Sequence, residues 1–178
     1  QGLYTTKEIN SVDDLAGLKF RTYNATLEQF ANLAGAAPTP GEVPDIPQAF
    51  STGRVEAMIT SPSTGVDSQA WDFVSHYYDV QAFIPKNMVI VNKSAYDALS
   101  EDVQAALEEA AELAEDRGFE MAATATTEAT QTMADNGMTV LPTPEGLATD
   151  FEEIAATMRA EWLDQAGENG QTIVDALN

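Results

Sequence analysis

The sequence predicts an α/β fold built on a mixed, largely parallel β-sheet, with one unusually long helix. Short apolar runs alternate with helix signals between Leu18 and Ser61, which is the rhythm of a parallel α/β sheet. A second pattern, with apolar residues at near-helical spacing, continues from Ser100 to Asn136. Hydrophobic residues make up 44% of the chain, so it has the composition of an ordinary globular protein.

The first half of the chain contains a predicted βαβαβ unit. A strand over residues 18–23 is followed by a helix that Asn24 or Thr26 caps and Gly35 ends, and then by a short strand over residues 36–39. A helix around residues 45–52 leads to a third strand over residues 55–60. Ligands of such sheets bind beyond the carboxyl ends of the strands, so the polar groups that follow the first and third strands are binding candidates.

The second half begins with a predicted strand over residues 87–92. Ser100 opens the long helix, which ends at Asn136-Gly137 and either bridges two bodies or bends near Gly118. A strand over residues 138–141 and amphipathic helices from about Leu147 onward complete the prediction.

The charge balance excludes several classes of partner. The chain has 8 Lys and Arg residues against 29 Asp and Glu residues, a formal net charge of −21 at pH 7. Nucleic acids and anionic membrane surfaces would repel it, and the acidity is typical of a solubilising surface. The acidic residues are spread along the chain without a calcium-loop motif, so we expect no metal site and no cofactor.

Neither cysteine chemistry nor a membrane span is expected. The chain has no cysteine, which excludes disulfides and thiolate sites, and no apolar run approaches the length of a membrane helix. Its first residues lack the basic and apolar blocks of a secretory signal, so we expect a mature, truncated or cytosolic chain.

No catalytic motif stands out. His76 is the only histidine, and its surroundings favour a structural role. The segment Ser61-Pro62-Ser63-Thr64-Gly65 comes nearest to a nucleophile elbow, but it contains a proline and lacks the first glycine. Nucleotide-binding loops and zinc motifs are absent as well. The sequence therefore favours a protein that is not an enzyme.

Arg21 is the most unusual cation because it lies within an apolar strand, near the carboxyl end of that strand. Burial of a guanidinium group without an anion is costly, so a carboxylate should face it. From position alone, an internal ion pair and a bound carboxylate ligand explain Arg21 equally well.

Several segments resemble one family. They are residues 9–21 (INSVDDLAGLKFR), 33–40 (LAGAAPTP) and 49–57 (AFSTGRVEA), with later agreement at residues 91–93, 96–100 (YDALS) and 136–138. Together, over essentially the whole chain, they closely resemble the DctP-type solute-binding proteins of tripartite ATP-independent periplasmic (TRAP) transporters.

The resemblance implies a two-lobed fold of the periplasmic-binding-protein, or Venus-flytrap, type. By that analogy the chain is a C-terminal portion that lacks most of the N-terminal lobe. Residues 1–86 would form the ligand-binding part of the second lobe, residues 87–126 would give a strand and a helix to the first lobe, and residues 127–178 would return to the second lobe.

The same resemblance implies a ligand site in which Arg21 pairs with a substrate carboxylate. Other roles stay open for Asn24 as a helix cap, for Asn87 as an amide at a strand start and for Trp71 as a core residue. The full set of expected ligand-binding residues is Arg21, Asn24, Thr60, Ser61, Ser63, Trp71 and Asn87.

The resemblance also implies a function: periplasmic capture of a small organic acid anion and its delivery to the membrane permease subunits of a TRAP transporter. The ligand would be a keto, hydroxy or aromatic acid or a dicarboxylate, and the missing N-terminal lobe would be needed to enclose it. Two alternatives remain open: a hydrolase that uses Ser61 or Ser63 in the same cleft, and an interaction fragment that binds no ligand.

Overall fold

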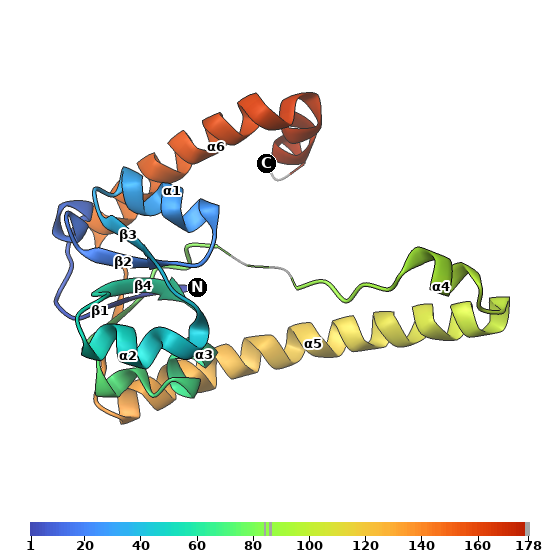
Figure 1. Cartoon of the computed structure of the whole chain (residues 1–178), viewed down its shortest axis with the longest axis horizontal. Helices are drawn as coiled ribbons and strands as arrows, with labels where there is room; N and C mark the ends of the chain where they lie inside the picture. The colour runs from blue at the N-terminus through green and yellow to red at the C-terminus, as the bar shows by residue number, and fades with distance from the viewer. Residues whose placement is uncertain (84, 86, 177–178) are drawn as a thin grey trace.

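A six-stranded mixed sheet with helices on both faces forms the body of the molecule (Figure 1). The computed structural model describes residues 1–83, 85 and 87–176. The strands run in the order β3-β2-β4-β1-β5-β6 across the sheet. Their bounds are β1 Gly2–Thr5, β2 Lys19–Thr22, β3 Ala37–Pro40, β4 Ala57–Thr60, β5 His76–Asp79 and β6 Thr139–Pro142.

The helices of the described residues differ widely in length. Three short 3-10 helices cover Val12–Leu15, Val43–Asp45 and Ala70–Asp72. The α-helices are α1 Ala25–Leu33, α2 Ile46–Ser51, α3 Pro62–Asp67, α4 Lys93–Asp97, α5 Glu101–Asp135 and α6 Glu145–Asp175.

The predicted βαβαβ unit is confirmed as β2-α1-β3-α2-β4. Strand β2 pairs in parallel with both β3 and β4, as the alternation of apolar runs and helix signals predicted. The sequence did not predict β1, which lies antiparallel between β4 and β5. Strand β5 pairs in parallel with β6, so the sheet is mixed and largely parallel.

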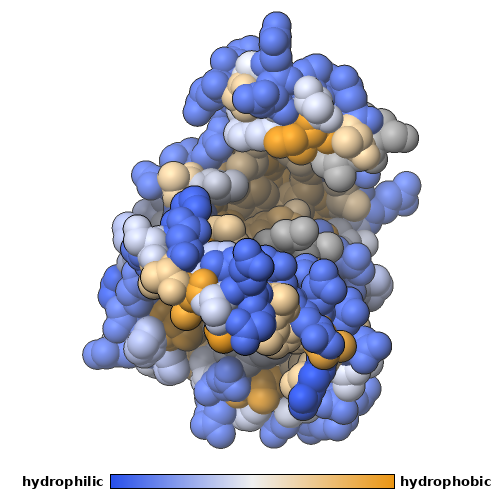
Figure 2. Space-filling view, turned by 90° about the vertical axis from the view of Figure 1, so that its right-hand side faces the viewer, coloured by the Kyte–Doolittle hydropathy of each residue, from blue (hydrophilic) through white to orange (hydrophobic). Residues whose placement is uncertain are grey.

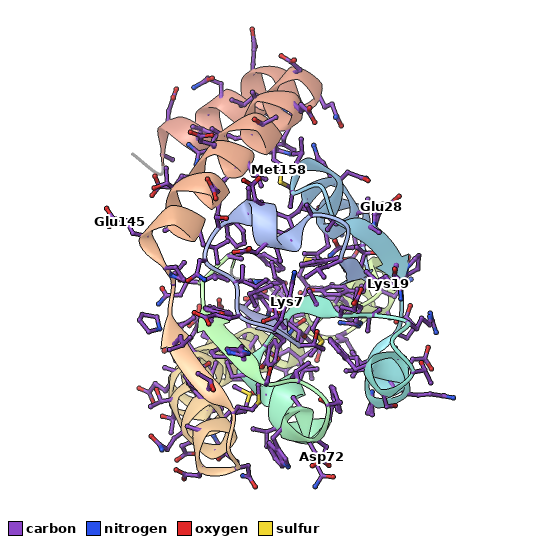
Figure 3. The ribbon with its side chains drawn as sticks, turned by 90° about the vertical axis from the view of Figure 1, so that its left-hand side faces the viewer. Lys7, Lys19, Glu28, Asp72, Glu145 and Met158 are labelled. Atoms are coloured by element: carbon purple, nitrogen blue, oxygen red, sulfur yellow. The ribbon has the colours of Figure 1, made fainter. Side chains whose placement is uncertain are left out.

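Alternation along the strands divides the core into two clusters. Leu3, Phe20 and Ile59 face the upper cluster, under α1 and α6, and Met158 of α6 points toward α1 (Figures 1 and 3). Their chain neighbours Tyr4 and Met58 face the lower cluster, which α2, α3 and the end of α5 cover. Arg21 is the β2 partner of Met58, so it lies on the lower face of the sheet.

Helix α5 is the long helix that the sequence predicts. It runs unbroken through Gly118. Of the two possibilities that the sequence left open, the bend near Gly118 is therefore wrong. Its C-terminal end packs against the body of the molecule, where Ala129 and Met133 are buried against α3 and the lower cluster. The remainder of α5 projects from the body (Figure 1). Helix α6 is also long, but non-helical backbone angles at Gly167 (φ 59°, ψ −143°) divide it.

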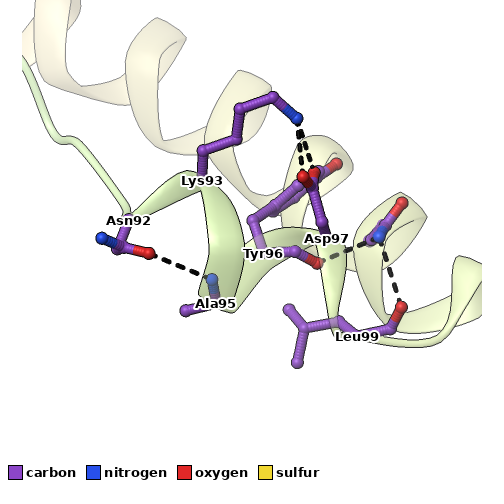
Figure 4. A network of polar contacts seen from close by, with 7 residues as sticks. Asn92, Lys93, Ala95, Tyr96, Asp97 and Leu99 are labelled. Carbon is purple, nitrogen blue, oxygen red and sulfur yellow. Dashed lines mark hydrogen bonds and ion pairs between the residues drawn. The ribbon is translucent and has the colours of Figure 1, made fainter.

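Helix α4 is tied to the start of α5 at the far end of the projection (Figure 4). The amide of Gln104 donates hydrogen bonds to the backbone carbonyls of Tyr96 (3.0 Å) and Leu99 (3.2 Å). Asn92 caps α4 by accepting a hydrogen bond from the backbone N–H of Ala95 (3.2 Å). The projecting part is therefore a helix pair with its own local bonds.

The predicted strand over residues 87–92 is not formed. Residues 87–92 have no regular structure, and Met88, Val89, Ile90 and Val91 are 83%, 106%, 84% and 63% exposed. A strand needs a neighbour that satisfies its backbone groups, and the described residues place none beside this segment. The apolar pattern of residues 88–91 therefore faces outward in this structure.

Candidate functional site

A cleft of about 300 Å³ lies where β2 and β4 end, on the side from which the chain runs out toward α4 (Figure 1). It brings together four of the expected residues, Arg21, Thr60, Ser61 and Asn87. The other residues that line it are Gln1, Tyr23, Glu42, Val43, Thr64 and Pro85. The site therefore forms where the carboxyl ends of parallel strands meet.

Arg21 is nearly completely buried, with 2% of its surface exposed. Its Nε donates a hydrogen bond to the carbonyl of Gly41 (2.9 Å), and its Cζ lies 5.0 Å from the centre of the Tyr23 ring. The buried Nη1 donates to no group of the described residues. Their one ion pair joins Lys93 to Asp97, so the internal ion pair that could have explained Arg21 is not formed.

Arg21, which lines the cleft, therefore carries a positive charge and a buried donor that is unused within the described residues. Burial lowers the pKa of its guanidinium, and the nearby Tyr23 and Glu42 oppose this effect. The ordinary pKa of arginine is so high that the group stays positive at neutral pH. A buried cation with an unused N–H is costly, and a planar carboxylate would supply both the missing charge and the missing acceptor.

Hydroxyl groups form the wall of the cleft beside Arg21. Thr60, which is 5% exposed, ends β4. Ser61 caps α3, because its Oγ accepts a hydrogen bond from the Thr64 backbone N–H (3.1 Å) and bonds the Thr64 hydroxyl (2.9 Å). The buried Tyr4 hydroxyl donates to the Ser61 carbonyl (2.9 Å), which ties this turn to the lower cluster.

The loop after β3 forms another wall, which the predicted set of ligand-binding residues does not include. Gly41 accepts from Arg21 and donates its own N–H to the Thr22 carbonyl (3.1 Å), which places Glu42 and Val43 at the cleft. The rule that drew attention to the ends of β2 and β4 applies equally to β3, since the three strands are parallel. The signal was therefore present at the end of the second predicted strand.

Three of the expected residues lie elsewhere. Asn24 caps α1 by accepting from the Leu27 backbone N–H (2.9 Å), which is the alternative role considered for it. Ser63 is exposed within α3. Trp71 packs half-buried against the lower cluster. This is the core role that stayed open for Trp71.

The described residues offer little support for other chemistry. His76 bonds its neighbour Ser75 (Nδ1 to Oγ, 2.8 Å), whereas the bonds of Ser61 go to Thr64. In the part of the chain that the structure describes, no three potential metal-binding side chains gather, and no helix is long and apolar enough to cross a membrane.

A larger hollow of about 460 Å³ lies between α1, α6 and residues 80–83, and Figure 2 shows the hollowed face of the molecule beneath the end of α6. Phe30, Phe83, Phe151 and Met158 are among its mainly apolar lining. None of its described lining residues is a cation, so this lining is poorly suited to an anion.

Comparison with known proteins places the chain in a family. Residues 2–165 match the sequence model of DctP, described as bacterial extracellular solute-binding protein, family 7. The structure is similar to that of the Bordetella pertussis receptor DctP7, an extracytoplasmic solute receptor binding pyroglutamic acid. The identity is 49% and the TM-score 0.94, over 98% of this chain and 58% of that one.

Two further solute-binding proteins are similar to this chain. A marine metagenome TRAP solute-binding protein specific for pyroglutamate is 39% identical, with a TM-score of 0.92 over 98% of this chain and 58% of that one. The C4-dicarboxylate-binding periplasmic protein DctP of Rhodobacter capsulatus is 30% identical over 84% of this chain and 42% of its own length.

The chain spans 58% of the two related structures and 42% of the R. capsulatus protein, so it corresponds to part of each. Its mixed α/β sheet with a long helix is the fold of TRAP periplasmic binding proteins, as the resemblance in the sequence implied. Since the family match covers residues 2–165, this chain belongs to the DctP family of bacterial extracellular solute-binding proteins.

Proposed function

We propose that the cleft at Arg21 captures a small organic carboxylate. The observation that carries this proposal is the buried guanidinium, which has no ion pair within the described residues and keeps an unused Nη1 donor. Two relatives with 49% and 39% identity bind pyroglutamate, and a more distant one is a C4-dicarboxylate-binding protein. Pyroglutamate is therefore the first ligand to test.

The protein acts as a receptor and leaves its ligand chemically unchanged. By analogy with its relatives it works in the periplasm and delivers the carboxylate to the membrane permease of a TRAP transporter. The hydrolase alternative has no support, since the Ser61 hydroxyl bonds Thr64 and the His76 ring bonds Ser75.

A second lobe completes the site. The relatives are longer than this chain, which spans 58% of the two related structures. Asn87, at the edge of the cleft, begins the exposed apolar segment over residues 87–91 that leads toward α4 and α5. Residues 87–126 belong to that lobe, and residues 1–86 and 127–178 form the lobe that carries Arg21. A ligand that touches both lobes favours their closed arrangement.

Titration calorimetry of pyroglutamate into the complete gene product that contains these residues tests the carboxylate site. Arg21→Ala should weaken binding by roughly tenfold to a hundredfold, because a charge-assisted hydrogen bond contributes about 1.5 to 3 kcal/mol. The control is Arg159→Ala, which removes the same charge from an exposed position on α6, within the lobe that carries Arg21. Equal affinity of the wild type and Arg21→Ala would refute the role of Arg21.

A further inference from the structure

Glu42 shares the cleft with Arg21 and carries the opposite charge. It is the only acidic side chain among the residues that line the described cleft. Its carboxylate is near enough to favour the charged form of Arg21, yet no ion pair joins the two side chains in the described part of the chain. The cleft therefore presents a positive and a negative group, and each remains available to a ligand.

The two residues that precede Glu42 are held by hydrogen bonds to their backbone groups. Gly41 accepts from Arg21 Nε (2.9 Å) and donates to the Thr22 carbonyl (3.1 Å). Arg54 Nη2 donates to the Pro40 carbonyl (2.5 Å). The Glu42 backbone is thus fixed relative to Arg21, although its side chain is exposed. A fixed backbone limits where the carboxylate can reach, which is a requirement for selecting a ligand.

The cleft residues differ in what they can accept. Four polar residues of the cleft can each donate or accept a hydrogen bond: Thr60, Ser61, Thr64 and Asn87. They therefore tolerate both donor groups and acceptor groups on a ligand. An ionised glutamate can only accept. Val43, which is 50% exposed beside Glu42, adds an apolar surface for the ligand's carbon atoms.

We propose that Glu42 selects ligands that carry an N–H donor next to their carboxylate group. Arg21 would hold the carboxylate while Glu42 accepts the N–H, so a lactam or amino acid fits and an oxygen analogue does not. In an analogue with a ring oxygen in place of the N–H, a lone pair of that oxygen would face the Glu42 carboxylate. The carboxylate would then have no donor to accept from. This inference rests on the proposed carboxylate site.

The test compares pyroglutamate with its lactone analogue, in which a ring oxygen replaces the N–H, by calorimetry on the complete gene product. The wild type should bind pyroglutamate more tightly by on the order of tenfold to a hundredfold, the range for one charge-assisted hydrogen bond. Glu42→Ala should reduce this preference to less than about threefold, mainly through weaker binding of pyroglutamate. Glu42→Gln, which keeps a neutral acceptor, should give an intermediate preference.

Two controls separate this inference from the carboxylate site. Asp45→Ala removes the same charge from an exposed position outside the cleft and should leave the preference unchanged. Arg21→Ala should weaken the binding of both pyroglutamate and its lactone analogue. An unchanged preference in Glu42→Ala, or equal binding of both ligands by the wild type, would overturn the role of Glu42 while leaving the carboxylate site intact. A wild type that binds neither ligand would overturn both.

Discussion

Arg21 is buried to a degree that stability alone does not explain. Its Nη1 makes no hydrogen bond within the described residues, and its single side-chain hydrogen bond reaches the Gly41 carbonyl. A buried charge without a partner ion destabilises a folded chain, while a ligand carboxylate would offset this cost only when bound. Under the proposed function, Arg21 improves binding at the expense of the stability of the unliganded protein, a common relation at functional sites.

Replacing Arg21 with methionine should stabilise the unliganded chain by about 1 kcal/mol, because it removes the unpaired charge and keeps a long apolar side chain. Water can replace the lost donor at the half-buried Gly41. Urea unfolding without ligand measures the effect. Arg117→Met on the exposed surface of α5 should change the free energy of unfolding by less than about 0.5 kcal/mol. A clear loss of stability in Arg21→Met would show that the guanidinium has a structural role.

At the scale of elements, α3 and the end of α5 pack without space for one more carbon atom. A Cβ placed on Gly65 of α3 would meet the Tyr4 hydroxyl and lie 2.8 Å from the Met133 sulfur. Tyr4 also holds the Ser61 turn of the cleft (2.9 Å). The same substitution in the exposed middle of α5 meets nothing, since no atom lies within 4 Å of a Cβ on Gly118.

Gly65→Ala should therefore lower the free energy of unfolding by roughly 1 to 3 kcal/mol through overpacking. Gly118→Ala should raise it by about 0.5 to 1 kcal/mol, because alanine favours a helix more than glycine does. Urea unfolding followed by circular dichroism compares the pair. Equal effects of the two substitutions would contradict the packing of α3 on α5.

The segment over residues 87–91 provides a second test at this scale. Ile90 is 84% exposed, whereas Ile59 of β4 is 1% exposed. Ile90→Ala should change the stability of the isolated chain by less than about 0.5 kcal/mol, but should cost roughly 2 to 4 kcal/mol in the complete gene product, where a second lobe would bury it. Ile59→Ala should lower the free energy of unfolding of both the isolated chain and the complete gene product. Equal tolerance of Ile90→Ala in both proteins would argue against the proposed lobe.

At the scale of the whole molecule, the proposed function makes the cleft one half of a site. Its wall of Arg21, Thr60 and Ser61 belongs to the sheet, while Asn87 lies on the chain that leaves it. A receptor that closes around its ligand needs contacts from both sides, because the ligand must favour the closed state over the open one.

The isolated chain should therefore bind pyroglutamate at least about a hundredfold more weakly than the complete gene product, the equivalent of two or three lost hydrogen bonds. Calorimetry on both proteins at the same ionic strength measures the difference. Circular dichroism of the isolated chain provides the control that it is folded. Equally tight binding would mean that one lobe suffices.

The sequence by itself determined much of this protein. Periodicity predicted the βαβαβ unit and the length of α5, because each depends on local spacing of apolar residues and on caps. Resemblance over essentially the whole chain, densest in residues 9–57, indicated a solute-binding protein of the TRAP type. Arg21 stood out because a cation inside an apolar strand conflicts with the pattern around it.

Only the tertiary structure decided the rest. It showed that Arg21 has no ion pair in the described residues, that the Glu42 loop lines the cleft while Trp71 packs against the lower cluster, and that β1 inserts between β4 and β5. It also showed that residues 87–92 form no strand here, despite a good strand pattern. The reason is common to all four: a side chain's partners and a strand's neighbours come from distant parts of the chain, and local spacing cannot specify them.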